Sequence, residues 1–112
     1  MAYQRGDIVL IPFPFSDLSA TKTRPAVVVS SQLFQEVRSE LLLAYVSSQV
    51  SKAHPKIDVV LKEWAAAGLL KPSFVRPKIA AIEPGLIVHH AGRLSAEDMA
   101  AVDDVLRLSL NL

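Results

Sequence analysis

The stretch Pro-Ala-Val-Val-Val-Ser-Ser at positions 25–31 decides the fold. Its branched apolar side chains predict a β-strand over Pro25–Ser31. A strand this apolar needs its edges covered, because an unpaired apolar edge invites aggregation. Five more runs rich in valine, isoleucine or leucine supply further strands: Asp7–Ile11, Leu41–Ser48, Lys56–Leu61, Lys78–Ile82 and Leu86–His90. The sequence therefore predicts a mainly β (α+β) fold in which short strands close into a small barrel.

Turns and short helices are predicted between these strands. Clusters of proline, glycine, serine and other polar residues are typical of turns. They fall at Pro12–Asp17, Ser19–Thr23, Ala53–Pro55 and Glu83–Gly85. Shorter helical turns are expected at Gln32–Val37 and Lys62–Leu69.

The C-terminal part of the chain predicts an amphipathic helix that begins after Ser95. The Ser95 hydroxyl can cap free backbone N–H groups, and Glu97 and Asp98 in the first turn suit the helix dipole. One apolar stripe is expected to face the barrel: Met99, Val102, Val105, Leu106 and Leu110. The residues expected to face water are Asp103, Asp104 and Arg107.

Length and composition limit the class of protein. With 112 residues, 51% of them hydrophobic and 21% charged, the chain predicts one folded domain over residues 1–112. The chain has no cysteine, which excludes disulfides and thiolate chemistry and favours a cytoplasmic location. No export leader is visible, and the apolar runs are shorter than the roughly 20 residues that span a bilayer. We therefore expect no membrane association.

Charge and histidine content give weaker indications. The net charge is only +1, but residues 71–93 hold four basic residues and one acid, which predicts either a locally basic face or scattered surface charge. The histidines are His54, His89 and His90, and neighbouring strand residues point to opposite faces, so His89 and His90 do not form a pair. No metal site is predicted. A general acid or base role for His54 or His90 stays open.

Arg24 is the strongest candidate for a functional side chain. It precedes Pro25 at the mouth of the apolar strand, and its planar guanidinium fits phosphate oxygens. The alternative is an ion pair with a carboxylate such as Asp17. Ser47, Ser48 and Gln49 follow another apolar strand, where they either serve a site or satisfy local backbone groups. Arg76 lies in the locally basic segment.

Three ordered motifs resemble the MazF/PemK family of toxin–antitoxin ribonucleases. They are Arg5–Leu10, Thr23–Ser30 and Lys71–Arg76, supported by the stretch Pro12–Leu18 and by the capped helix after Gly92–Leu94. The resemblance runs nearly end to end. It implies a dimeric, SH3-like barrel of the MazF/Kid/CcdB type that cuts single-stranded RNA without metal or other cofactor. It also implies a cognate antitoxin as partner, and contact with DNA only through that antitoxin.

The resemblance also assigns residues. Arg24 matches the family arginine that precedes proline, Ser47 falls where many relatives have a catalytic threonine, and Arg76 matches an arginine near the scissile phosphate. These three are the expected catalytic residues. The expected RNA-binding residues around them are Lys22, Thr23, Ser48, Gln49 and Lys78.

One departure from the family pattern leaves alternatives open. Where PemK-like members continue with an acid after the arginine, this chain reads Arg76-Pro77-Lys78, so the general base is unassigned. The leading hypothesis is a sequence-specific endoribonuclease toxin that inhibits translation. The alternatives are an inactive binding module that still pairs with an antitoxin, and a gyrase inhibitor resembling CcdB.

Overall fold

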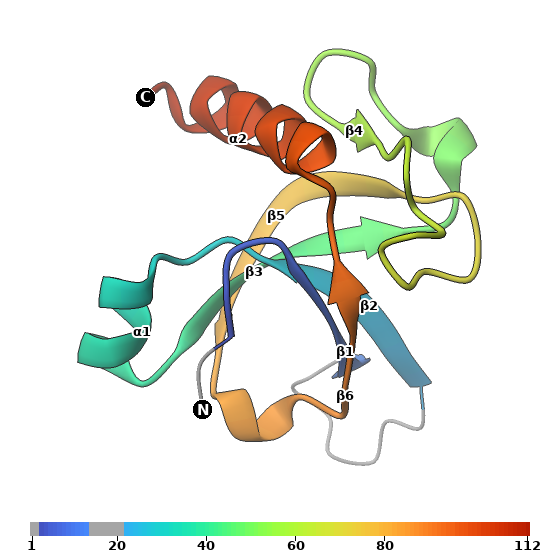
Figure 1. Ribbon diagram of the computed structural model, residues 1–112. Helices are drawn as coiled ribbons and strands as arrows, with labels where there is room; N and C mark the ends of the chain where they lie inside the picture. The colour runs from blue at the N-terminus through green and yellow to red at the C-terminus, as the bar shows by residue number, and fades with distance from the viewer. Residues whose placement is uncertain (1–2, 14–21) are drawn as a thin grey trace.

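A computed structural model of the protein describes residues 3–13 and 22–112, and in these ranges it is a six-stranded antiparallel sheet with two α-helices. The strands are β1 (Asp7–Phe13), β2 (Lys22–Val28), β3 (Leu41–Ser47), β4 (Val59–Val60), β5 (Phe74–Ile82) and β6 (His89–Arg93). The sheet order is β4-β5-β3-β2-β1-β6. The helices are α1 (Gln32–Arg38) and α2 (Ala96–Leu110), with 3₁₀ turns at Val50–Lys52 and Pro84–Leu86. The mainly β fold with a C-terminal helix is thus confirmed, and Figure 1 shows how strongly the sheet curls.

Several element boundaries differ from the sequence prediction. β2 begins earlier than predicted, at Lys22, and β6 begins only at His89 because a 3₁₀ turn occupies Pro84–Leu86. The predicted strand Lys56–Leu61 forms a ladder only at Val59–Val60. The turn clusters Pro12–Asp17 and Ser19–Thr23 fall largely outside the described residues.

The helical turn predicted over Lys62–Leu69 forms as a single turn, in which the N–H of Ala67 donates to the carbonyl of Glu63 at 3.2 Å and the N–H of Leu69 donates to that of Trp64 at 3.1 Å. Gly68 ends it with a positive φ of 92°, a conformation that glycine adopts without steric cost. The N–H groups of Lys62 and Glu63 donate to the carboxylate of Asp98 on α2, at 3.1 and 2.9 Å. Contacts with α2 therefore hold the start of this turn, in addition to its own backbone hydrogen bonds.

The sheet has an apolar core on each face. On one face Ile8, Val27, Ala44 and Val46 pack with the 61–69 segment and with Val102 of α2. The core of the other face is made by Val9, Ile11, Ala26, Val28, Leu41, Leu43 and Ile82, with Tyr3, Leu86 and Ile87 packed against it. Because both faces are covered, β1 is continuously apolar from Ile8 to Phe13 and β3 from Leu41 to Val46.

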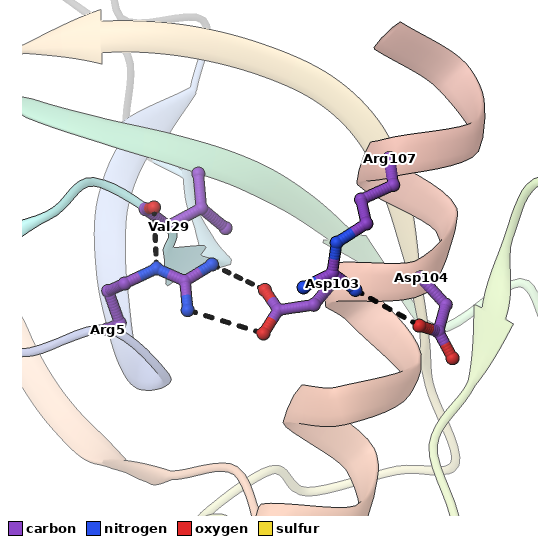
Figure 2. Close-up of polar contacts among 5 residues, drawn as sticks. All are labelled: Arg5, Val29, Asp103, Asp104 and Arg107. Carbon is purple, nitrogen blue, oxygen red and sulfur yellow. Dashed lines mark hydrogen bonds and ion pairs between the residues drawn. The ribbon is translucent and has the colours of Figure 1, made fainter. Parts of the chain in front are cut away.

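The C-terminal helix docks by its predicted cap and by an ion pair. Ser95 Oγ accepts a hydrogen bond from the N–H of Asp98, which confirms the cap. Asp103 lies on the outer side of the helix but is only partly exposed, because its carboxylate accepts two hydrogen bonds from the guanidinium of Arg5 (Figure 2). The same guanidinium donates to the carbonyl of Val29 at 2.9 Å. Leu110 does not face the barrel, since it is 58% exposed near the helix end.

Asp98 is expected to be a main support of this docking. It is 2% exposed, and replacing it with alanine leaves the N–H groups of Lys62 and Glu63 without their acceptor. We expect Asp98→Ala to lower the free energy of unfolding by about 2 kcal/mol. Urea denaturation of the parent and the variant measures this difference in the free energy of unfolding. Asp104→Ala, on the exposed side of α2, is the matched control and should change stability by less than about 0.5 kcal/mol. Equal stability of the two variants would contradict the assigned role.

Candidate active site

The strand register gathers polar side chains at one end of the sheet. Ile11 pairs with Arg24, Ala26 pairs with Tyr45, and Tyr45 pairs with Arg76. Directly opposed residues of antiparallel strands point to the same face, and so do residues two apart on one strand. Arg24, Tyr45 and Arg76 therefore share the face that carries Ile11.

These side chains surround a cavity of about 210 Å³. Arg24, Ser47 and Arg76, the three residues expected to be catalytic, all line it, together with Gln49. The remaining lining residues are Ile11, Pro25, Tyr45 and Val46. Among the residues that the structure describes, this lining contains two guanidinium groups and no carboxylate. The cavity thus favours an anion.

A bulge in β5 shapes the wall beside Arg76. Tyr45 pairs with Arg76, whereas the preceding Ala44 pairs with Ile79, so Pro77 and Lys78 are two extra residues in this strand. Proline lacks the N–H that a ladder needs, which makes it suited to such a bulge. The bulge brings the Lys78 ammonium to 5.2 Å from the centre of the Tyr45 ring, a cation–π contact. A third cation therefore lies against Tyr45, which lines the same cavity as the two arginines.

Tyr45 is a lining residue that the sequence analysis did not single out. Burial raises the pKa of its phenol above 10.0, so the group is neutral near pH 7. A neutral phenol can donate a hydrogen bond to a phosphate oxygen. The sequence does carry an indication of this role: Tyr45 lies two residues before Ser47 on an apolar strand, so the two side chains point to the same face.

Ser47 has a local role as well as a place in the cavity. Its Oγ accepts a hydrogen bond from the N–H of Gln49 at 3.1 Å, as the alternative of local backbone satisfaction predicts. A hydroxyl that accepts a hydrogen bond can still donate one through its own O–H. Ser47 can therefore hold the turn and still donate into the cavity.

The other expected RNA-binding residues are distributed around this cavity. Lys78 and Gln49 line an adjoining cavity of about 450 Å³, which also contains Asp58, a carboxylate that the sequence analysis did not single out. One Asp58 oxygen accepts a hydrogen bond from the N–H of His54 at 2.8 Å.

Thr23 and Ser48 line a further cavity. Lys22 is exposed at the start of β2 and lines none of these three cavities. Asp17, the alternative partner of Arg24, lies outside the described residues.

His54 and His90 line none of these three cavities, whereas His89 lines the cavity that also contains Thr23, Ser48 and Arg24. His54 Nδ1 accepts a hydrogen bond from the N–H of Lys56 at 3.1 Å. His90 is 3.5 Å from the buried carboxylate of Asp7, and its ring meets Tyr3 edge to face.

Within residues 3–13 and 22–112, no group of three or more histidine, aspartate or glutamate side chains is placed to hold a metal ion. In the same ranges, no helix has the length and apolar character to cross a membrane.

Comparison with known proteins identifies relatives of this fold. A family model described as PemK-like, MazF-like toxin of type II toxin–antitoxin system matches residues 4–110. A search of curated proteins gives no match.

Solved structures match over almost the whole chain. An endoribonuclease in complex with its cognate antitoxin, from a mycobacterial species, has a TM-score of 0.80 and 15% identity, covering 99% of this chain and 97% of the other. The MazE–MazF structure from Deinococcus radiodurans has a TM-score of 0.76 and 20% identity, covering 100% and 98%. The Mycobacterium tuberculosis toxin MazF-mt6 has a TM-score of 0.70 and 18% identity, covering 95% and 97%. At these identities the likeness shows the fold.

Proposed function

Since the chain belongs to the family of PemK-like, MazF-like toxins of type II toxin–antitoxin systems, we propose that it is a metal-independent endoribonuclease that cuts single-stranded RNA at preferred sequences. The observation that carries the proposal is the cavity in which Arg24 and Arg76 flank Ser47, with no carboxylate among its described lining residues. Such a cavity suits a phosphodiester and the additional negative charge that develops on it during cleavage.

The proposed reaction is an internal transesterification. The ribose 2′-oxygen attacks the adjacent phosphorus, the bond from phosphorus to the 5′-oxygen of the next nucleotide breaks, and the products are a cyclic phosphate and a 5′-hydroxyl. We assign Arg24 and Arg76 to stabilisation of the charged phosphorane. Ser47 and the neutral phenol of Tyr45 donate hydrogen bonds to phosphate or leaving-group oxygens. The proton of the attacking hydroxyl passes to solvent, and the departing 5′-oxygen takes up a proton from solvent to become the 5′-hydroxyl.

The proposal includes partners and location. The protein acts as a homodimer in the cytoplasm, where RNA cleavage inhibits translation. A cognate antitoxin silences it by laying an acidic or apolar tail over Arg24 and Arg76, and DNA is reached only through that antitoxin. Charge complementarity supports this arrangement, because the same cations would attract an acidic tail and an RNA strand.

Arg76 provides a test of the proposed site. Arg76→Ala removes one of the two guanidinium groups of the cavity, and we expect the cleavage rate of a long single-stranded RNA to fall roughly 100-fold. Arg38→Ala is the matched control, because it removes the same charge from the last turn of α1. Gel analysis of the RNA products gives both rates. If both variants lose the same activity, a general charge effect explains the loss and the assignment of Arg76 is wrong.

The bulge at Pro77–Lys78 favours one second candidate function. It occupies the position where the resemblance places an acid, so the protein could bind its antitoxin without cutting RNA. That function predicts no cleavage of several unrelated RNAs by the parent, together with tight binding of the antitoxin tail.

A further inference from the structure

A second cavity, of about 490 Å³, adjoins the candidate active site. Arg24, Pro25 and Val46 line both cavities, so the two lie next to each other at the ends of β2 and β3. The other walls come from residues 68–73 and from β6, including His89. The cleavage chemistry proposed above uses none of these additional residues, although Thr23 and Ser48 at this cavity are among the residues expected to bind RNA.

The register places this second cavity on the other face of the sheet. Leu10 pairs with Pro25 on one side and with His89 on the other, and these three side chains alternate with Ile11 and Arg24. The two cavities thus open on the two faces at the same end of the sheet. An extended single-stranded RNA that crosses this end of the sheet would run from one cavity to the other and would pass Arg24 on the way.

A close approach of two backbone segments holds the cavity wall in place. A Cβ at Gly68 would lie 2.2 Å from the carbonyl oxygen of Ala91, and one at Gly92 would lie 2.2 Å from that of Ala67. Only glycine permits this approach, so the loop that carries residues 68–73 is fixed against β6. This wall of the cavity is therefore held in place by backbone packing.

The lining has the chemistry that a nucleobase needs. Its walls are mainly apolar, and Leu70 at the cavity is 94% exposed, so a flat ligand could cover it. His89 supplies an exposed imidazole ring, one of the ring types on which unpaired RNA bases stack. Thr23 and Ser48 supply hydroxyls for a base edge. The charged groups among the described lining residues are Arg24 and Lys71, both cationic.

We propose that this cavity receives one nucleobase of the RNA, next to the phosphodiester that Arg24 contacts. The inference rests on the proposed function, since it assumes a single-stranded RNA at Arg24. The base stacks on His89 and covers Leu70, while Lys71 neutralises a neighbouring phosphate. The site thereby selects a strand with an unpaired base at this position.

The test compares strands with and without bases. Four homo-heptanucleotides of 2′-O-methyl RNA, which lack the attacking hydroxyl, are titrated against the full-length protein by fluorescence anisotropy. The tightest binder is then compared with a heptamer that has the same backbone and no bases. We expect the parent to prefer the base-bearing strand roughly tenfold. His89→Ala, and to a smaller extent Leu70→Ser, should reduce that preference to about twofold or less.

His90→Ala is the matched control, because His90 is the neighbouring exposed histidine on the opposite face of β6, and it should keep the full preference. A parent without any preference for bases would overturn the proposal. An equal loss of affinity for both strands in His89→Ala would overturn it as well, because that result indicates a backbone contact.

The binding assay tests the base site, and the cleavage assay tests the ribonuclease activity, so each proposal can fail without the other. Base preference in a protein that never cuts RNA supports the base site and contradicts the ribonuclease activity. Cleavage by a protein without base preference supports the activity and contradicts the base site.

Discussion

Arg24→Ala is expected to lower the rate of RNA cleavage by roughly 100- to 1,000-fold, the usual cost of removing one preorganised donor to a developing anion. Arg24 borders both the candidate active site and the adjoining cavity. Its guanidinium can donate two parallel hydrogen bonds to a phosphoryl group, which no other side chain type does with this geometry. Because the side chain is exposed, the fold should tolerate its removal.

Arg24→Lys separates charge from geometry. Lysine keeps the positive charge but presents it as a single ammonium, so we expect most of the activity to remain lost. Initial rates on a fluorogenic single-stranded RNA, together with thermal unfolding of each variant, measure both properties. Activity in Arg24→Ala equal to that of the parent would remove Arg24 from the mechanism.

Gly92→Ala is expected to produce the largest loss of stability. The new Cβ would lie 2.2 Å from the carbonyl oxygen of Ala67 and 2.8 Å from its carbonyl carbon, and both are backbone atoms that cannot rotate away. The loop that precedes β5 would have to move away from β6. We expect a loss of about 3 kcal/mol, a large part of the 5–15 kcal/mol that stabilises a typical domain.

Gly85→Ala is the control for this prediction, because a Cβ at Gly85 meets no atom within 4 Å. It should change the free energy of unfolding by less than about 0.5 kcal/mol. Urea denaturation of both variants provides the comparison. A Gly92→Ala protein as stable as Gly85→Ala would mean that the two segments do not approach as closely as described.

The parts of the fold with local signals could be predicted from the sequence. The valine run of β2 and the Ser95 cap of α2 are local patterns, and both elements form. Arg24 and Ser47 each stand at the end of an apolar run, which is a local signal of a functional position. The structure places them around one cavity with Arg76, whose selection depended on the family resemblance.

Features that depend on contacts between distant segments were missed. Asp98 was interpreted as a first-turn acid of α2, but it also accepts hydrogen bonds from residues about 35 positions earlier. The place of Tyr45 in the cavity depends on the register of β3 against β5, with its bulge at Pro77–Lys78. Gly68 and Gly92 meet only after the whole sheet has formed.

The most direct test of the central claim is incubation of the purified protein with a long single-stranded RNA in EDTA, followed by analysis of the new termini. The proposed function predicts discrete cuts in the absence of metal ions, with a cyclic phosphate on one side of each cut and a 5′-hydroxyl on the other. Intact RNA across several unrelated sequences, or cleavage that requires an added metal ion, would contradict it.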